Sequence, residues 1–369
     1  MSSSSLFVAL AAEIAVLCSC SQGGYSPPGK VESLVLRPST LAIESDGRDA
    51  VHFVALADGE PVTDGVSLYD GVTNAPLDLP DLAFTSTVPG TYYFYAEYAS
   101  ARSDRVAVTV VDFDLPQIPE DPAPESTSFQ RKVLLTQFTG TGCGYCPGMI
   151  TLLRNVLADG EYSSRVVHTA AHTYNPGDPA YLSQRLDQAM GVTGYPTVVA
   201  DMCLAYSNYN VESGLRNIID EAYGRSAAKA GIAVATSCEG NTAVVFVSLK
   251  AAQASEFRVG AWLLEDGVYG PQKNYNQGYW TGDYNNHDNC IRYADSRVSN
   301  IDYSGFSVGT LDAGQEIRYA FTIDLDDKWV KENCHVTVFV TTPDDGMEYT
   351  VNNAVDVPLG ESIAYAYAE

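Results

Sequence analysis

Two cysteines, Cys143 and Cys146, stand two residues apart in the stretch TGTGCGYCPG (residues 139–148). The apolar run before them, KVLLTQF, predicts a buried strand, and the segment after them, PGMITLLRNVLADG, carries apolar residues at helical spacing. A cysteine pair between a strand and the first turn of a helix can form a redox-active disulfide. Because the N-terminus of a helix stabilises a thiolate, we expect Cys143 to be the exposed nucleophile and Cys146 the resolving thiol.

A metal site is the competing interpretation of the cysteine pair. A structural zinc site would need two more ligands, usually a second closely spaced pair, but Cys203 has no neighbouring cysteine. His168 and His172 are four residues apart on a predicted strand. We therefore predict no metal and no cofactor. His172 ends that strand and could lie near Cys143, where it would stabilise the thiolate or move a proton. The alternative is a loop histidine bonded to the backbone.

A second motif, MGVTGYPT (residues 190–197), closely resembles the G-V-x-G-x-P-T stretch of the thioredoxin family. In that family the stretch carries a cis-proline, which implies that Pro196 is the corresponding residue here. The resemblance also implies that Tyr195, just before it, faces substrate. Tyr145 lies between the two cysteines and is the other candidate substrate contact. The tetrapeptide Cys-Gly-Tyr-Cys matches that of bacterial periplasmic disulfide isomerases.

Two positions depart from the thioredoxin pattern. Gln137 stands where thioredoxins place a buried carboxylate, and an amide cannot accept a proton from the second thiol. Gly142 stands where a Trp usually precedes the first cysteine. These departures leave a fixed, non-catalytic disulfide as an alternative.

Composition limits the classes of function. The chain has 369 residues, which is more than one compact core usually holds. It carries 21 basic and 46 acidic residues, for a formal net charge of −25, and no basic cluster. Nucleic acid is therefore not an expected partner.

The pattern along the chain predicts a multidomain protein. Residues 31–113 contain short alternating runs typical of a β-sandwich and resemble bacterial immunoglobulin-like domains. Alternating strands and helices follow, including a predicted helix over residues 178–190 with Asp178 as its N-cap. After residue 227 only strands are evident. The expected divisions are a signal peptide (1–19), a tether (20–30), an Ig-like β-sandwich (31–113), a Pro/acidic linker (114–128), an α/β thioredoxin-like domain (129–226) and a C-terminal β-sandwich domain (227–369).

The N-terminus predicts export and a lipid anchor. Residues 6–17 form an apolar run of signal-peptide length, and LCSC resembles a bacterial lipobox. This implies that Cys20 is lipidated after cleavage. Cys143, Cys146 and the four later cysteines then remain, an even number that permits disulfides in an exported protein.

A polar loop, residues 269–289, carries several aromatic side chains among Asn, Gly and Asp. It is a candidate for partner binding, and the alternative is that its aromatic rings cover the C-terminal sandwich.

The segments VLLTQFTGTGCGYCPGM, GYPT, DKWVKENCHVTVFV and NNAVDVPL together resemble the outer membrane protein 28 related family, from about Lys132 to the C-terminus. Another segment, NNHDNCIRYA, looks like that family's HNHVLR segment. The resemblance implies an outer-membrane lipoprotein of a Gram-negative cell envelope, and we favour the periplasmic face. The expected function is that of a thiol–disulfide oxidoreductase or isomerase acting on envelope proteins with thiols or disulfides. The alternative is a non-catalytic binding or structural lipoprotein on a thioredoxin-like scaffold.

Overall fold

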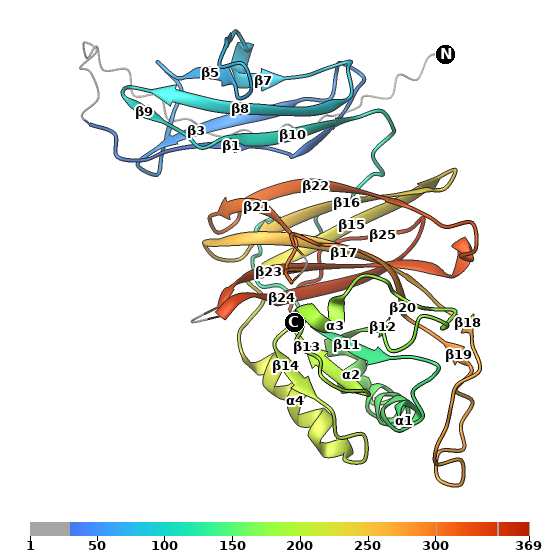
Figure 1. Ribbon diagram of the computed structural model, residues 1–369. Coiled ribbons are helices and arrows are strands. Elements are labelled where there is room, and N and C mark those ends of the chain that lie inside the picture. The colour runs from blue at the N-terminus through green and yellow to red at the C-terminus, as the bar shows by residue number, and fades with distance from the viewer. Residues whose placement is uncertain (1–29, 300, 345–346, 369) are drawn as a thin grey trace, which may run out of the picture.

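The computed structural model describes residues 30–299, 301–344 and 347–368. The predicted signal peptide, the proposed anchor Cys20 and most of the tether lie outside these residues. Strands predominate, and the α-helices gather at one end of the molecule (Figure 1). Within the described ranges, no helix has the length and apolar character needed to cross a membrane.

The N-terminal unit consists of two β-sheets that share one core. One sheet has the order β1-β3-β4 with β7 on β3, and the other has the order β2-β10-β8-β5-β6 with β9 on β8. Side chains from both sheets, such as Phe53 and Phe94, pack together. The elements are β1 (Leu34–Pro38), β2 (Ala42–Glu44), β3 (Val51–Ala57), β4 (Glu60–Val62), β5 (Ser67–Asp70), β6 (Pro76–Leu77), the 3-10 turn η1 (Pro80–Leu82), β7 (Ala83–Phe84), β8 (Gly90–Tyr98), β9 (Ala101–Arg102) and β10 (Val106–Val111).

The central part alternates strands and helices, as the sequence predicts. Strand β11 pairs in parallel with β12 and antiparallel with β13, which pairs antiparallel with β14. Helices α1 and α4 pack against one face of this sheet and bury an apolar cluster there. The elements are β11 (Val133–Thr139), α1 (Cys146–Leu157), α2 (Gly160–Arg165), β12 (Val166–His172), α3 (Leu186–Ala189), β13 (Thr197–Ala200), β14 (Leu204–Tyr206) and α4 (Glu212–Gly224).

The central sheet continues into the C-terminal strands. Ala170 of β12 pairs in parallel with Cys290 of β20, which joins the two parts into one nine-stranded sheet over the described residues. Its order is β14-β13-β11-β12-β20-β17-β23-β24, with β21 on β17. The sheet therefore does not end at residue 226, and the strands near the cysteine pair are held directly by C-terminal strands.

A second C-terminal sheet, of order β22-β16-β15-β25, packs on the first through a large apolar core (Figure 1). The C-terminal elements are β15 (Ala230–Glu239), β16 (Thr242–Ala251), β17 (Ser255–Glu265), β18 (Val268–Tyr269), β19 (Asn286–His287), β20 (Cys290–Asp295), β21 (Phe306–Leu311), β22 (Glu316–Asp324), the 3-10 turn η2 (Lys331–Asn333), β23 (Cys334–Asp344), β24 (Met347–Pro358) and β25 (Ser362–Ile363).

The helix predicted over residues 178–190 is wrong apart from its last turn, α3. Asp178 does not cap a helix. Its carboxylate accepts hydrogen bonds from the backbone N–H of Ala180 at 2.8 Å, from His172 at 2.8 Å and from the distant Thr141 N–H at 2.6 Å. The chain then runs beside the end of β12, where the Leu182 N–H donates to the carbonyl of His172. Leu182 and Leu186 are buried as the helical pattern requires, but most of the segment buries them in a non-helical conformation.

Candidate redox site

The cysteine pair forms a disulfide at the start of α1. Cys143 and Cys146 are joined, with their Cα atoms 5.4 Å apart, and Cys146 is the first residue of the helix. Strand β11 ends at Thr139, and the Cys143 N–H donates to the Gly140 carbonyl at 2.9 Å, which folds the connection into a tight turn. The disulfide therefore lies where unpaired helix N–H groups can stabilise a thiolate.

The prediction that Cys143 is exposed is wrong. Its exposed fraction is 3 %, and that of Cys146 is 0 %. The cause is the polar loop of residues 269–289, which we call the covering loop. Its backbone donates from Lys273 to the Thr141 carbonyl at 2.8 Å and from Tyr275 to the Gly144 carbonyl at 2.9 Å.

Side chains of the covering loop add to this closure. The Gln272 amide donates to the Cys143 carbonyl at 2.8 Å. The Tyr275 ring lies so close to Gly144 that a Cβ atom at this position would clash with it. The same ring meets that of Tyr145 edge to face, with centroids 5.1 Å apart. Tyr145 remains 48 % exposed and marks the edge of the covered site.

The covering loop also packs along α1. Trp280 and Tyr284 are buried, at 5 % and 7 % exposure. Trp280 lies against Gly148, and the Tyr284 hydroxyl is 2.9 Å from that of Thr151. The loop's buried aromatic rings therefore cover α1, and not the C-terminal sandwich. Tyr279 is 78 % exposed.

The Tyr195–Pro196 peptide bond is cis, as the sequence motif predicts. Thr197 pairs with Phe138, so Pro196 lies beside the end of β11, next to the turn that carries Cys143. The Tyr195 hydroxyl donates to Asp187 at 3.1 Å and lies 2.9 Å from the Thr173 hydroxyl. Burial is the main cause of the raised pKa of Tyr195.

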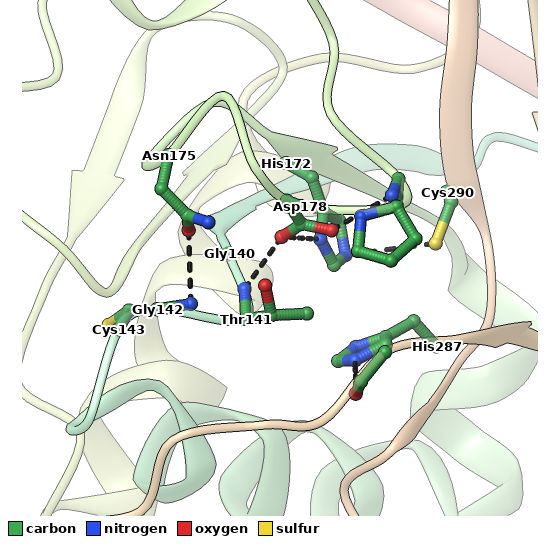
Figure 2. Close-up of polar contacts among 12 residues, drawn as sticks. Gly140, Thr141, Gly142, Cys143, His172, Asn175, Asp178, His287 and Cys290 are labelled. Atoms are coloured by element: carbon green, nitrogen blue, oxygen red, sulfur yellow. Dashed lines mark hydrogen bonds and ion pairs between the residues drawn. The ribbon is translucent and has the colours of Figure 1, made fainter.

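His172 has other partners than the proposed Cys143. Its Nδ1 lies 2.8 Å from Asp178 Oδ2, and its Nε2 lies 3.7 Å from Cys290 Sγ (Figure 2). Burial alone would raise the pKa of Asp178. The hydrogen bonds from His172 and from the backbone N–H groups of Thr141 and Ala180 nevertheless lower it to about 2. Asp178 is thus an ionised carboxylate, which can only accept hydrogen bonds. The proton shared between Asp178 and His172 is therefore carried by His172 Nδ1.

The set of Cys290, His172 and Asp178 resembles a catalytic triad in composition but is built as a support. Cys290 is fully buried, and burial raises the pKa of its thiol well above the usual value. Since the His172 proton is on Nδ1, its Nε2 accepts from the Cys290 thiol, and the full burial of this thiol keeps it away from any substrate. Through Asp178 the set anchors the Thr141 N–H, two residues before Cys143 (Figure 2). No local sequence pattern indicates this role for Asp178. The NNHDNCIRYA segment includes His287 and Cys290, but nothing in it indicates which residues they contact.

Gly142 and Gln137, the two residues that depart from the thioredoxin pattern, each have a distinct environment in the structure. The Gly142 N–H donates to Asn175 Oδ1 at 3.0 Å, and a Cβ atom at Gly142 would lie 2.9 Å from that oxygen. A larger residue at this position would therefore displace Asn175. Gln137 is buried on the side of β11 that faces α1, and its Nε2 has no hydrogen-bond partner among the described residues.

The remaining cysteines in the described ranges are free. Cys290 and Cys334 are buried, Cys203 is half-buried and Cys238 is exposed. The even number of cysteines therefore does not lead to further disulfides here. In the same part of the chain, no group of three or more His, Cys, Asp or Glu side chains is arranged to hold a metal ion.

Residues 183–362 match the family model of the outer membrane protein Omp28. The match supports an outer-membrane or cell-envelope protein. The match confirms the resemblance to the outer membrane protein 28 family over these residues. It does not include the cysteine pair, which precedes residue 183. No curated protein matches the chain.

Two solved structures show similarity to parts of this chain. HBP35 of Porphyromonas gingivalis is 20 % identical, with a TM-score of 0.52 over 66 % of this chain and 79 % of that one. Protein AGR_C_4864 from Agrobacterium tumefaciens is 16 % identical, with a TM-score of 0.40 over 63 % of this chain and 95 % of that one. At 20 % identity, the likeness to HBP35 concerns the fold alone.

Proposed function

We propose that this protein exchanges disulfides in the bacterial cell envelope through Cys143 and Cys146. The observation that carries the proposal is the position of the disulfide, in the first turn of α1 and directly after β11. Pro196 lies beside the end of the same strand. Strand, cysteine pair, helix and proline follow each other as in thioredoxins, so the central part is proposed to be a thioredoxin-like domain.

The proposed oxidation of a substrate proceeds in two exchanges. A substrate thiolate attacks Cys143 Sγ, which forms a mixed disulfide and releases Cys146 as a thiolate. A second substrate thiolate attacks the substrate sulfur of that mixed disulfide and releases Cys143. The substrate loses two electrons and two protons, and the cysteine pair gains them. In the isomerase direction, the Cys143 thiolate attacks a substrate disulfide, and Cys146 can resolve the adduct.

The local chemistry supports Cys143 as the attacking sulfur. It precedes α1, whose N-terminal dipole favours a negative charge. Gln137 cannot take the proton of Cys146, so that proton must pass to solvent or to substrate. Because the covering loop buries both sulfurs, exchange requires the loop to move away from residues 141–144.

A non-catalytic role is the second candidate, and the same burial favours it. With both cysteines at 3 % exposure or less and an amide at position 137, the disulfide could serve only to fix the turn before α1. The protein would then be a binding or structural envelope lipoprotein.

The proposed setting is the periplasmic face of the outer membrane. The match of residues 183–362 supports the envelope, and the lipobox-like sequence supports anchoring through Cys20. The N-terminal sandwich, proposed to be Ig-like, would act as a spacer. The proposed partners are envelope proteins that carry thiols or disulfides.

The test is to trap the mixed disulfide in the full-length protein. Exposed Cys238 could form adventitious adducts, so each variant is made in a Cys238→Ser background. Cys146→Ser should accumulate mixed disulfides with envelope proteins on non-reducing gels. The matched control, Cys143→Ser, should accumulate none.

The reduction potential of the pair separates the two candidate functions. An exchanging pair should equilibrate with glutathione, whereas structural disulfides have potentials below about −300 mV. A potential in that low range, together with no adducts from Cys146→Ser, would refute the oxidoreductase and leave the binding scaffold.

A further inference from the structure

A cavity of about 220 Å³ lies between β11, β12, α1 and the end of the covering loop. It is separate from the disulfide, and neither cysteine lines it. Side chains alternate between the faces of a strand, so every second residue of β11 and β12 points to the α1 side. On this side the two strands present Gln137, Thr139, His168 and His172, a polar patch within an otherwise apolar core.

Three polar atoms of this patch lack a partner. Gln137 Nε2, Thr139 Oγ1 and His168 Nε2 are shielded from solvent and form no hydrogen bond with any described residue. Gln137 and Thr139 are 4 % and 2 % exposed. Buried polar groups are nearly always paired in folded proteins. Three unpaired groups around one cavity therefore indicate a missing occupant.

The three atoms are donors. An amide Nε2 donates, and a threonine hydroxyl can donate. The third follows from the tautomer of His168: its Nδ1 lies 3.4 Å from Asn289 Nδ2, which can only donate, so Nδ1 accepts and Nε2 carries the proton. Burial lowers the pKa of His168 to about 4, so the ring is neutral near neutral pH.

The other imidazoles of the lining are already engaged. His172 is bonded to Asp178 and lies beside Cys290, and the His287 Nε2 lies 3.1 Å from the Gly270 carbonyl. The three free donors thus define what the cavity recognises, which is a group that accepts hydrogen bonds.

The opposite wall of the cavity is apolar. Ile150, Leu153 and Leu157 of α1 line it, and the cationic Arg154 lies beside them. The one acidic side chain of the lining, Asp288, is exposed and accepts from the Gly267 N–H at 3.0 Å. An occupant therefore meets donors at one end, hydrocarbon at the other and a cation nearby.

We propose that this cavity binds a small carboxylate with a short apolar tail. Its carboxylate would accept from Gln137, Thr139 and His168, and its tail would lie against α1. A cavity of about 150 Å³ holds benzene, so 220 Å³ suits a molecule of about nine non-hydrogen atoms, the size of benzoate. The inference does not depend on disulfide exchange.

The experiment uses the full-length protein and benzoate as the probe, with benzamide as a neutral control of the same size. Isothermal titration calorimetry measures affinity, and methyl NMR of Ile150, Leu153 and Leu157 locates the binding. We expect one benzoate per chain, shifts of those methyl signals and binding of benzamide at least about tenfold weaker.

Two pairs of variants test the donors. Thr139→Val should weaken benzoate binding about three- to tenfold, because one hydrogen bond is lost. Its matched control is Thr136→Val, on the same strand but bonded to Thr169 on the other face, which should leave the affinity unchanged. Gln137→Glu should weaken binding at least about tenfold by repelling the carboxylate, and Gln137→Leu less so.

Several outcomes would overturn the inference. They are the absence of heat and of methyl shifts at about 10 mM benzoate, equal binding of benzamide, and an equal loss of affinity in Thr136→Val and Thr139→Val. Should one variant fail to fold, the comparison of benzoate with benzamide on the unaltered protein still decides the question.

Discussion

Gln272→Ala should speed the reduction of the Cys143–Cys146 disulfide. The Gln272 amide bridges the covering loop to the turn that it covers. It donates to the Cys143 carbonyl at 2.8 Å and lies 3.3 Å from the carbonyls of Gly140 and Thr141. The substitution removes these contacts and leaves the backbone bonds of Lys273 and Tyr275 in place.

The magnitude follows from the number of bonds lost. One good hydrogen bond and two long ones together contribute about 1–2 kcal/mol to the closed state. Since 1.4 kcal/mol is a factor of ten, the population of the open state should rise about five- to thirtyfold. If a reductant attacks only the open state, the rate of reduction should rise by the same factor.

The assay is reduction by dithiothreitol, with free thiols alkylated and counted by mass spectrometry. The matched control is Gln315→Ala, which removes a glutamine bonded to the Asp312 N–H far from the site. Its reduction rate should equal that of the unaltered protein. Two outcomes would show that the loop does not gate the disulfide. One is an unchanged reduction rate in Gln272→Ala. The other is that the unaltered protein is already reduced as fast as an unprotected small-molecule disulfide.

Three further predictions concern stability. Burial would lower the pKa of His335, but an ion pair with Asp266 and a hydrogen bond to Asp356 raise it to about 9; this stabilisation of about 3 kcal/mol is complete below the unfolded pKa near 6.5 and is lost as the pH rises through 9. Urea unfolding at a pH below 6.5 and at a pH above 9 should show that loss of stability. His335→Gln should remove most of this difference between the two pH values. Asp178→Asn should cost about 2–4 kcal/mol, because Oδ2 accepts from Thr141 and His172 and Oδ1 accepts from the Ala180 N–H, so an amide NH₂ would face a donor in either orientation; an unchanged urea midpoint would contradict the anchoring role. Asp121→Ala should cost about 3 kcal/mol by leaving the buried Lys250 ammonium without its carboxylate, and the double variant with Lys250→Met should recover most of that stability.

The parts of the site that the sequence predicted are those encoded by local patterns. The disulfide at the start of α1 and the cis bond before Pro196 follow from short motifs. The alternating run AVHFVALA, residues 50–57, predicted a strand, and in β3 buried and exposed residues alternate from Val51 to Ala55. In each case the residues that decide the structure lie within a few positions of one another.

The parts that it missed depend on partners far away in the sequence. Asp178 has the helix-capping pattern, but the Thr141 N–H and His172 bind its carboxylate instead. His172 meets Cys290 because β12 pairs with β20, a contact between residues 118 positions apart. A helical period over residues 178–190 indicated which residues are buried but could not reveal these competing bonds.

The continuous sheet explains why the disulfide is covered. β20 extends the sheet beside β12, and the short β18–β19 ladder pairs Val268 with His287 and Tyr269 with Asn286 just before it. Both ends of the covering loop are thus fixed near the end of the sheet where β11 leads into the turn before α1. A loop held at both ends beside that turn can satisfy its backbone by bonding residues 141–144, as Lys273 and Tyr275 do. We therefore expect the C-terminal strands to control access to the disulfide, so a change that loosens the β18–β19 ladder should speed reduction of the disulfide by dithiothreitol without altering either cysteine.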